Sequence, residues 1–210
     1  MINKFEMKTT ILELSNERPI FHSEADFQHG LAWAIHRRNP QARVRLEYNK
    51  VSLNNRTTHI DIFLADSRTA IELKYKTDLI SPFNYDGETY SLKDHSAQDT
   101  GRYDFCRDLE RLENMVDLGV AAHGYAVFLS NEPQYWKEGR KLAPCDQSFR
   151  LHQGRRLEGR LDWQHGTSEG TKRKRTCAVT LKRSYVLDWV SYHTFDAIRN
   201  GKFQYLMVEV

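Results

Sequence analysis

The chain is poor in cysteine and has no long apolar run. Its 210 residues include only three cysteines, Cys106, Cys145 and Cys177, which are widely spaced and form no CxxC pair. An odd and scattered set of this kind argues against a disulfide framework and against a cysteine zinc site. No stretch reaches the roughly 18 consecutive apolar residues of a transmembrane helix, and the N-terminal stretch lacks a signal-peptide apolar run. We therefore expect a cytoplasmic protein with reduced thiols and no membrane partner.

The chain also lacks a large excess of charge and the glycine-rich loops that bind nucleotides. Lysine and arginine number 31 against 28 aspartate and glutamate residues, which leaves a formal net charge of +3. This balance allows a nucleic-acid partner without requiring one. Neither GxxxxGK[ST] nor GxGxxG occurs, so nucleotide-driven and dinucleotide chemistry have no support. The length and the 40% hydrophobic content suit a single domain over residues 1–210.

Hydrophobic periodicity predicts an α/β fold. A first helix is expected over residues 23–39, because Ser23 is a good N-cap and Pro40 marks a stop. The other predicted elements are strands over 42–49, 58–65 and 69–76, a polar aromatic loop over 81–90, a second helix over 96–118 and a strand over 123–131. The strand–helix–strand order implies that strands 69–76 and 123–131 pair in parallel through a right-handed crossover.

These elements predict a mixed central sheet flanked by helices. The core is expected over about residues 20–131, and a β-rich elaboration over about residues 132–210. The last segment of the chain, FQYLMVEV, is expected to form an edge strand.

The strands on either side of Asp66–Ser67 carry facing carboxylates when they fold as a hairpin. In that register Asp61 lies opposite Glu72, and Lys74 follows on the same face. Ile60, Ile62, Leu64, Ile71, Leu73 and Tyr75 are expected together on the other face. Like charges on cross-strand partners are destabilising unless a cation lies between them, and Mg²⁺ prefers carboxylate oxygens. The alternative is a solvated sheet face on which basic neighbours pair with the two acids.

The pattern of Asp61, followed eleven positions later by Glu72–Leu73–Lys74, resembles the PD-(D/E)XK nuclease superfamily. The core of that family, a helix, three strands, a helix and a strand, matches residues 23–131, about half of the chain. The resemblance implies a restriction-endonuclease-like core in which Asp61 and Glu72 bind Mg²⁺, with Mn²⁺ as a substitute. It also implies that Glu24 completes the metal site and that Lys74 is the catalytic lysine. Ile60 stands where many members have proline.

The resemblance implies a metal-dependent nuclease that hydrolyses phosphodiester bonds, with a DNA endonuclease as the expected activity. The alternative is a non-catalytic nucleic-acid-binding or assembly protein that keeps the fold and uses its basic second half. The pattern does not distinguish DNA from RNA or endonuclease from exonuclease, and it leaves a homodimer open.

Two further groups of side chains are candidates for contacts with phosphate. Gln98 and Arg102 precede the apolar stripe of the second helix, so they are expected near a helix N-terminus that favours anions. The basic segment Lys172, Arg173, Lys174 and Arg175 can attract a phosphate backbone electrostatically. The alternatives are a polar helix start without a role and a solvated loop.

Overall fold

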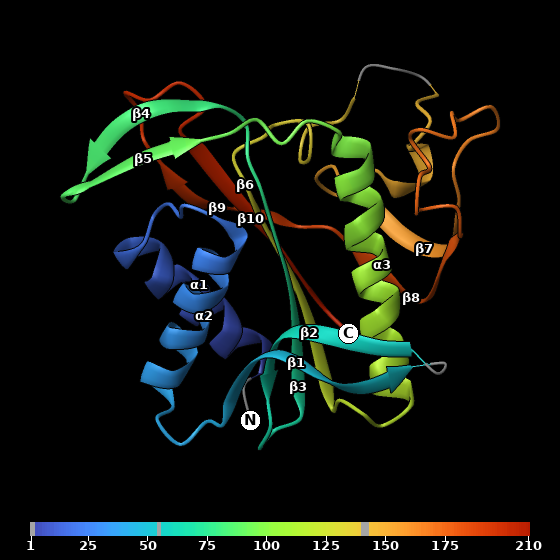
Figure 1. Cartoon of the computed structure of the whole chain (residues 1–210), viewed down its shortest axis with the longest axis horizontal. Helices are drawn as coiled ribbons and strands as arrows, with labels where there is room; N and C mark the ends of the chain where they lie inside the picture. Colours follow the sequence, from blue (N-terminus) through green and yellow to red (C-terminus); the bar gives the residue numbers. More distant parts are fainter. Residues whose placement is uncertain (1–2, 54–55, 140–142) are drawn as a thin grey trace.

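The computed structural model describes residues 3–53, 56–139 and 143–210, and its centre is a mixed six-stranded sheet (Figure 1). The described helices are α1 (Lys4–Glu17), α2 (Glu24–Arg38) and α3 (Gln98–Asp117), with a short 3₁₀ turn at Gln147–Phe149. The strands of the sheet are β1 (Val44–Leu53), β2 (Arg56–Leu64), β3 (Thr69–Lys76), β6 (His123–Ser130), β9 (Trp189–Thr194) and β10 (Lys202–Glu209). Two separate hairpins are formed by β4 (Ile80–Tyr85) with β5 (Glu88–Leu92) and by β7 (Arg156–Leu161) with β8 (Val179–Val186).

The strand order of the sheet is β1-β2-β3-β6-β10-β9. β3 and β6 pair in parallel, as predicted, and the crossover between them contains α3. The expectation of an edge strand at the C-terminus is wrong, because β10 lies between β6 and β9 and pairs antiparallel with both. A chain-terminal apolar strand is thereby buried in the sheet, which satisfies its backbone groups on both sides.

Helices cover both faces of the sheet. In Figure 1, α1 and α2 lie on one side and α3 on the other. The core under α1 and α2 includes Phe27 and Leu31 of α2 packed with Leu73 of β3, all almost fully buried. The core under α3 includes Leu109 and Phe128, and it continues into the β7–β8 hairpin. The central strands therefore have no face open to water, which is why β6 is an almost continuous apolar run.

Five of the six residues predicted on the apolar face of the hairpin share one core. Ile62, Leu64, Ile71, Leu73 and Tyr75 belong to the core under α1 and α2, but Ile60 belongs to the core under α3. The register between β1 and β2 shifts between Tyr48 and Val51, and Glu47 has a positive φ of 47°. Tyr48 is the partner of Ile60, and a bulge increases the local twist of a strand pair, so the simple alternation fails there.

Two elements have no counterpart among the predicted ones. The first is α1, which begins with a capping box between Asn3 and Glu6 and buries Met7, Ile11 and Leu14 at helical spacing. The second is the β4–β5 hairpin, which replaces the loop expected over 81–90. Its turn is Asp86–Gly87, with positive φ at both residues, a type that Asp-Gly favours. None of the described helices combines the length and the apolar character needed to cross a membrane.

The β7–β8 hairpin is fastened to α3 by a buried carboxylate. Glu113 is fully buried, and its oxygens accept hydrogen bonds from the backbone N–H groups of Lys182 and Arg183 and from the hydroxyl of Tyr185, at 2.8–2.9 Å. Burying a carboxylate is tolerated when hydrogen bonds satisfy its oxygens, and both oxygens of Glu113 accept at least one.

We expect Glu113→Ala to lower the free energy of unfolding by about 3 kcal/mol, because it leaves two N–H groups and a hydroxyl without an acceptor and opens a cavity. Urea unfolding followed by circular dichroism measures the change. Glu158→Ala, at an exposed glutamate on β7, is the matched control and should change stability little. Equal midpoints for the two variants would contradict the assigned role of Glu113.

Candidate functional site

Asp61 and Glu72 are brought near each other, but they are not partners in the strand ladder. The predicted register is confirmed where β2 and β3 pair, because Ile62 lies opposite Ile71 and Leu64 opposite Thr69. The ladder ends at Ile62 and Ile71, however, and does not continue to Asp61 and Glu72. Figure 1 shows that β1 and β2 run in a different direction from most of β3. Asp61 and Glu72 therefore lie just beyond the last paired residues, where β2 and β3 separate and leave a gap between them.

Carboxylates fill this gap and replace the missing ladder bonds. The backbone N–H of Leu73 donates to Oδ2 of Asp61 at 2.6 Å, and that of Tyr75 donates to Oε2 of Glu24 at 2.8 Å. These N–H groups point to the same edge of β3, because backbone donors alternate sides along a strand. Gln28, one helical turn after Glu24, donates to the carbonyl oxygen of Asp61 at 2.6 Å. The start of α2 is thus bonded to both separating strands.

On the other face of β3, two residues of α3 pair with the predicted site. The ammonium Nζ of Lys74 lies 2.6 Å from Oδ2 of Asp108, and Nη2 of Arg111 lies 2.5 Å from Oε2 of Glu72. Nη2 of Arg111 also donates a hydrogen bond to Oδ1 of Asp108 at 2.9 Å. Asp108 therefore joins the two cationic side chains of the cluster.

Asp108 and Arg111 are residues that sequence analysis missed. They stand one turn apart on α3 and flank the predicted apolar stripe of Phe105, Leu109 and Leu112. One feature of the sequence could have indicated them. Asp108 and Arg111 are opposite charges next to the apolar stripe of a helix that is expected to pack on the sheet. Only the packing of α3 on β3 decides that they meet Glu72 and Lys74.

Burial and like charges make Glu72 and Asp61 harder to ionise. Glu72 is 1% exposed, and burial, followed by the neighbouring Asp108 and Asp61 carboxylates, raises its pKa well above the usual range despite the opposing effect of Arg111. Burial also raises the pKa of Asp61, and it outweighs the hydrogen bond from Leu73 and the charge of Lys74. Both acids therefore favour either a proton or an additional cation.

The free oxygens of the cluster fit a hard divalent cation. Glu24, Asp61 and Glu72 each have one oxygen held by a backbone N–H or by Arg111. Oε1 of Glu72 is buried and has no hydrogen-bond partner among the described residues. Carboxylate oxygens are the ligands that Mg²⁺ prefers, and it commonly uses one or two carboxylates and several waters. With all four acids ionised, including Asp108, the cluster holds four negative charges against two positive ones.

The predicted metal ligands do not form the tightest acidic group in the described residues. That group is Asp78, Asp94 and Glu132, whose oxygens lie within 4.8 Å of one another. Asp78 and Glu132 follow the adjacent ends of β3 and β6, which parallel strands bring to the same edge of a sheet. The oxygens of Glu132 already accept hydrogen bonds from the backbone of Gln134 and from Gln98. Glu24, Asp61 and Glu72 are spread more widely.

The structure buries Arg102 away from any phosphate and leaves Gln98 half-buried, with one hydrogen bond inside the protein. Gln98 Nε2 donates to Glu132 at 3.2 Å. Arg102 is 2% exposed and pairs with Asp146 at 2.5 Å, and it also donates to the carbonyl of Gln134 at 2.8 Å. Arg102 therefore fastens the segment after β6 to α3. Sequence spacing could not show this, because its partners are more than 30 residues away.

The basic segment is also largely committed to pairs within the protein. Arg175 forms two hydrogen bonds of 2.7 Å with Asp104 of α3, and Lys172 pairs with Glu169 at 2.7 Å. Arg173 and Lys174 are exposed, and neither forms an ion pair with another described residue. Of the four residues of the basic segment, only Arg173 and Lys174 retain a charge without an ion-pair partner among the described residues.

A cavity of about 330 Å³ adjoins Glu24 and the end of β3. It is lined by Lys76 and Lys93, with His22 and His95 nearby. The backbone N–H of Thr77 donates to Nδ1 of His95, so the ring proton of the neutral histidine lies on Nε2. Burial, with a contribution from Lys76, lowers the pKa of His95, so this ring stays neutral at pH 7.

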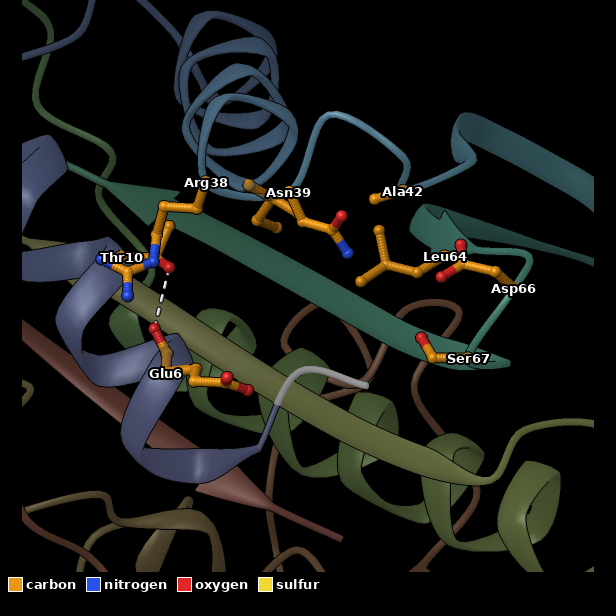
Figure 2. A pocket seen from close by; sticks show the side chains of 9 residues that line it. Glu6, Thr10, Arg38, Asn39, Ala42, Leu64, Asp66 and Ser67 are labelled. Atoms are coloured by element: carbon orange, nitrogen blue, oxygen red, sulfur yellow. Dashed lines mark hydrogen bonds between the residues drawn. The ribbon is translucent and has the colours of Figure 1, made fainter.

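A second cavity, of about 280 Å³, holds none of the predicted site residues. Figure 2 shows its walls, which are side chains of α1, of the end of α2 and of the β2–β3 turn, including Thr10, Arg38 and Asp66. It lies at the end of α2 opposite to Glu24, so we do not assign it to the same site.

We expect Glu72→Gln to stabilise the metal-free protein at pH 8 by about 1 kcal/mol or more, since one unit of pKa elevation corresponds to about 1.4 kcal/mol. The pKa of Glu72 is higher in the folded than in the unfolded state, so the wild type loses stability as the pH rises from the usual value of 4.5 through the raised pKa. Glu72→Gln has no carboxyl group at this position and so does not lose stability in this way. Urea unfolding in EDTA at pH 5 and pH 8 measures the free energy of unfolding of both proteins, with Glu158→Gln as control. A variant no more stable than the wild type at pH 8 would refute the assigned cost.

Comparisons of the chain with protein-family models, with curated proteins and with solved structures give no match. The chemistry of the side chains is therefore the basis for any functional assignment.

Proposed function

We propose that the protein is a metal-dependent nuclease that hydrolyses phosphodiester bonds, with DNA as the expected substrate and endonucleolytic cleavage as the expected mode. The observation that carries the proposal is the gap between β2 and β3. Asp61 and Glu24 are bonded there to the backbone of β3, and Glu72 and Lys74 stand beside them on the same strand. Structural ion pairs alone give no reason to bury Glu72 with an oxygen that lacks a partner.

The order of elements also supports the proposal. α2, β1, β2, β3, α3 and β6 follow one another, and β3 pairs in parallel with β6. This is the order of a restriction-endonuclease-like core, which the pattern of Asp61, Glu72 and Lys74 resembles. Fold alone does not give function, so the proposal depends on the side chains in the gap.

Asp61 and Glu72 would hold the divalent cation, and Glu24 would support it directly or through water. When bound, the cation supplies Lewis-acid polarisation of a phosphate and lowers the pKa of a coordinated water. The protein contributes position, because Asp61 and Glu24 are fixed by hydrogen bonds to β3 and cannot rotate freely.

Lys74 acts in this proposal as a donor and a positive charge. Burial disfavours its ammonium form, but Asp108, Glu24 and Asp61 outweigh burial and raise its pKa above the usual value. A lysine that stays protonated cannot take a proton from water. It can donate hydrogen bonds to the attacking water or to a phosphate oxygen, where it stabilises the charge that develops during the reaction.

The cavity beside Glu24 offers a place for a neighbouring phosphate of the substrate. Lys76 and Lys93 line it, and neither forms an ion pair with a described residue. His95 presents a neutral ring whose Nε2–H can donate. Cationic and hydrogen-bonding groups next to the acidic cluster suit a charged backbone that passes the site.

The alternative is a non-catalytic nucleic-acid-binding protein. It is favoured by one observation, since Lys74 and Arg111 already pair with Asp108 and Glu72. In that case Arg173 and Lys174, which remain exposed and unpaired in the described structure, would carry the binding. The two functions differ in whether divalent cations bind through Asp61.

We expect Lys74→Ala to lower the cleavage rate by 10²-fold or more, because it removes a preorganised donor from the site. Linear, circular and branched DNA are incubated with Mg²⁺ or Mn²⁺, and RNA substrates follow if no DNA is cut. Lys202→Ala, at an exposed lysine of β10, is the matched control and should retain the wild-type rate. Activity that survives in Lys74→Ala, or metal binding by calorimetry that survives in Asp61→Ala, would reject the proposed site.

We expect the double variant Lys76→Ala/Lys93→Ala to bind DNA more weakly. The slope of log K against log salt concentration should fall in magnitude by about two, since each lysine–phosphate contact contributes about one. Fluorescence anisotropy between 50 and 200 mM NaCl measures this slope. The double variant Arg173→Ala/Lys174→Ala is the comparison. A loss of slope in the second variant and not in the first would favour the binding-protein alternative.

A further inference from the structure

Arg111 contacts Glu72, one of the carboxylates that the proposed cation needs, and also Asp108 of its own helix. Its Nη2 lies 2.5 Å from Oε2 of Glu72 and 2.9 Å from Oδ1 of Asp108. We propose that Arg111 takes the place of the cation at Glu72 in the metal-free protein, and that cation binding releases it to bind a phosphate of the substrate. This inference rests on the proposed function and adds a residue that binds substrate in response to the metal.

The contact between Arg111 and Glu72 compensates charge but leaves half of the carboxylate unsatisfied. Nη2 of Arg111 lies against Oε2 of Glu72 and also donates to Asp108, whereas Oε1 of Glu72 has no hydrogen-bond partner in the described structure. Glu72 is 1% exposed, so an ionised carboxylate at this position needs a nearby positive charge. Arg111 provides that charge through one oxygen only, at 2.5 Å, and a small divalent cation coordinated by the carboxylate can replace it.

Asp108 can retain Arg111 in the site after Glu72 has bound a cation. The hydrogen bond between Arg111 and Asp108 joins residues one turn apart on α3, so it does not depend on Glu72. Asp108 also pairs with Lys74, which keeps both cationic side chains beside the gap. Release from Glu72 therefore requires only a change in the side-chain angles of Arg111.

Arg111 has unused donors for a phosphate. Its Nε is buried and has no hydrogen-bond partner in the described part of the chain, while the side chain as a whole is 30% exposed. A guanidinium presents five N–H groups in a planar fork that matches two oxygens of a phosphate. A lysine at this position would keep the charge but lose the paired geometry.

The proposal predicts opposite effects of Arg111 on the two ligands. Because Arg111 competes with the cation for Glu72, its removal should tighten cation binding, by about five- to tenfold if the competition has the usual size of a coupling between sites. The same removal should weaken binding of DNA in the presence of the cation, because a phosphate contact is lost. A residue that only supports the fold would not produce opposite changes.

The first measurement is calorimetric titration of Mn²⁺ into the full chain, for the wild type, Asp61→Ala, Arg111→Gln and Arg107→Gln. Arg107 is the matched control, since it lies one turn earlier on α3 and pairs with Glu110. We expect a lower dissociation constant for Arg111→Gln and no change for Arg107→Gln. Unchanged or weaker Mn²⁺ binding by Arg111→Gln would overturn the inference. Absence of Asp61-dependent binding in the wild type would instead reject the proposed function.

The second measurement is anisotropy of a short DNA duplex with Ca²⁺, which accepts the same oxygen ligands with looser geometry. Arg111→Gln and Arg111→Lys should both bind this DNA at least fivefold more weakly than the wild type. Arg111→Lys keeps the positive charge, so it also serves if Arg111→Gln fails to fold by circular dichroism. Wild-type DNA affinity in Arg111→Lys would show that charge alone matters and would overturn the assignment of a phosphate-binding fork.

Discussion

The separation of β2 from β3 after Ile62 and Ile71 is the constraint on which the rest of the site depends. It leaves N–H groups of β3 without ladder partners, at a depth where unpaired donors are costly. The carboxylates of Asp61 and Glu24 accept those N–H groups, and Gln28 takes the carbonyl of Asp61. The hydrogen bonds at this break in the sheet hold the acidic side chains in place and attach α2 to both β2 and β3.

The second constraint is the burial of charge on the opposite face of β3. Glu72 is covered by α3, and it is accommodated through Arg111 and through a raised pKa. Such an arrangement is less favourable than an apolar contact of the same size. Protein sites that bind a charged ligand commonly carry a cost of this kind, because the groups that would satisfy the ligand remain incompletely satisfied without it.

The C-terminal part of the chain contributes to the same body as the predicted core. β9 and β10 extend the central sheet beyond β6, and the β7–β8 hairpin is bonded to α3 through Glu113. Several basic residues of this part serve as structural partners, as Arg175 does with Asp104. Counts of basic residues therefore overestimate how many positive charges are available to a ligand. Some of them pair with acidic residues that are distant in the sequence, and such pairs cannot be predicted from the local sequence.

Periodicity in the sequence is enough to predict most of the helices and strands of the core and the register of the hairpin. Ser23 and the apolar spacing placed α2, and alternation placed Asp61, Glu72 and Lys74 on strands that do pair in the expected register at Ile62 and Ile71. Three features come from packing and could not be predicted from periodicity. The ladder stops before Asp61, α3 brings Asp108 and Arg111 onto Glu72 and Lys74, and β10 lies inside the sheet. The physical reason is that periodicity reports which side of an element is buried, whereas contacts between elements depend on how they pack.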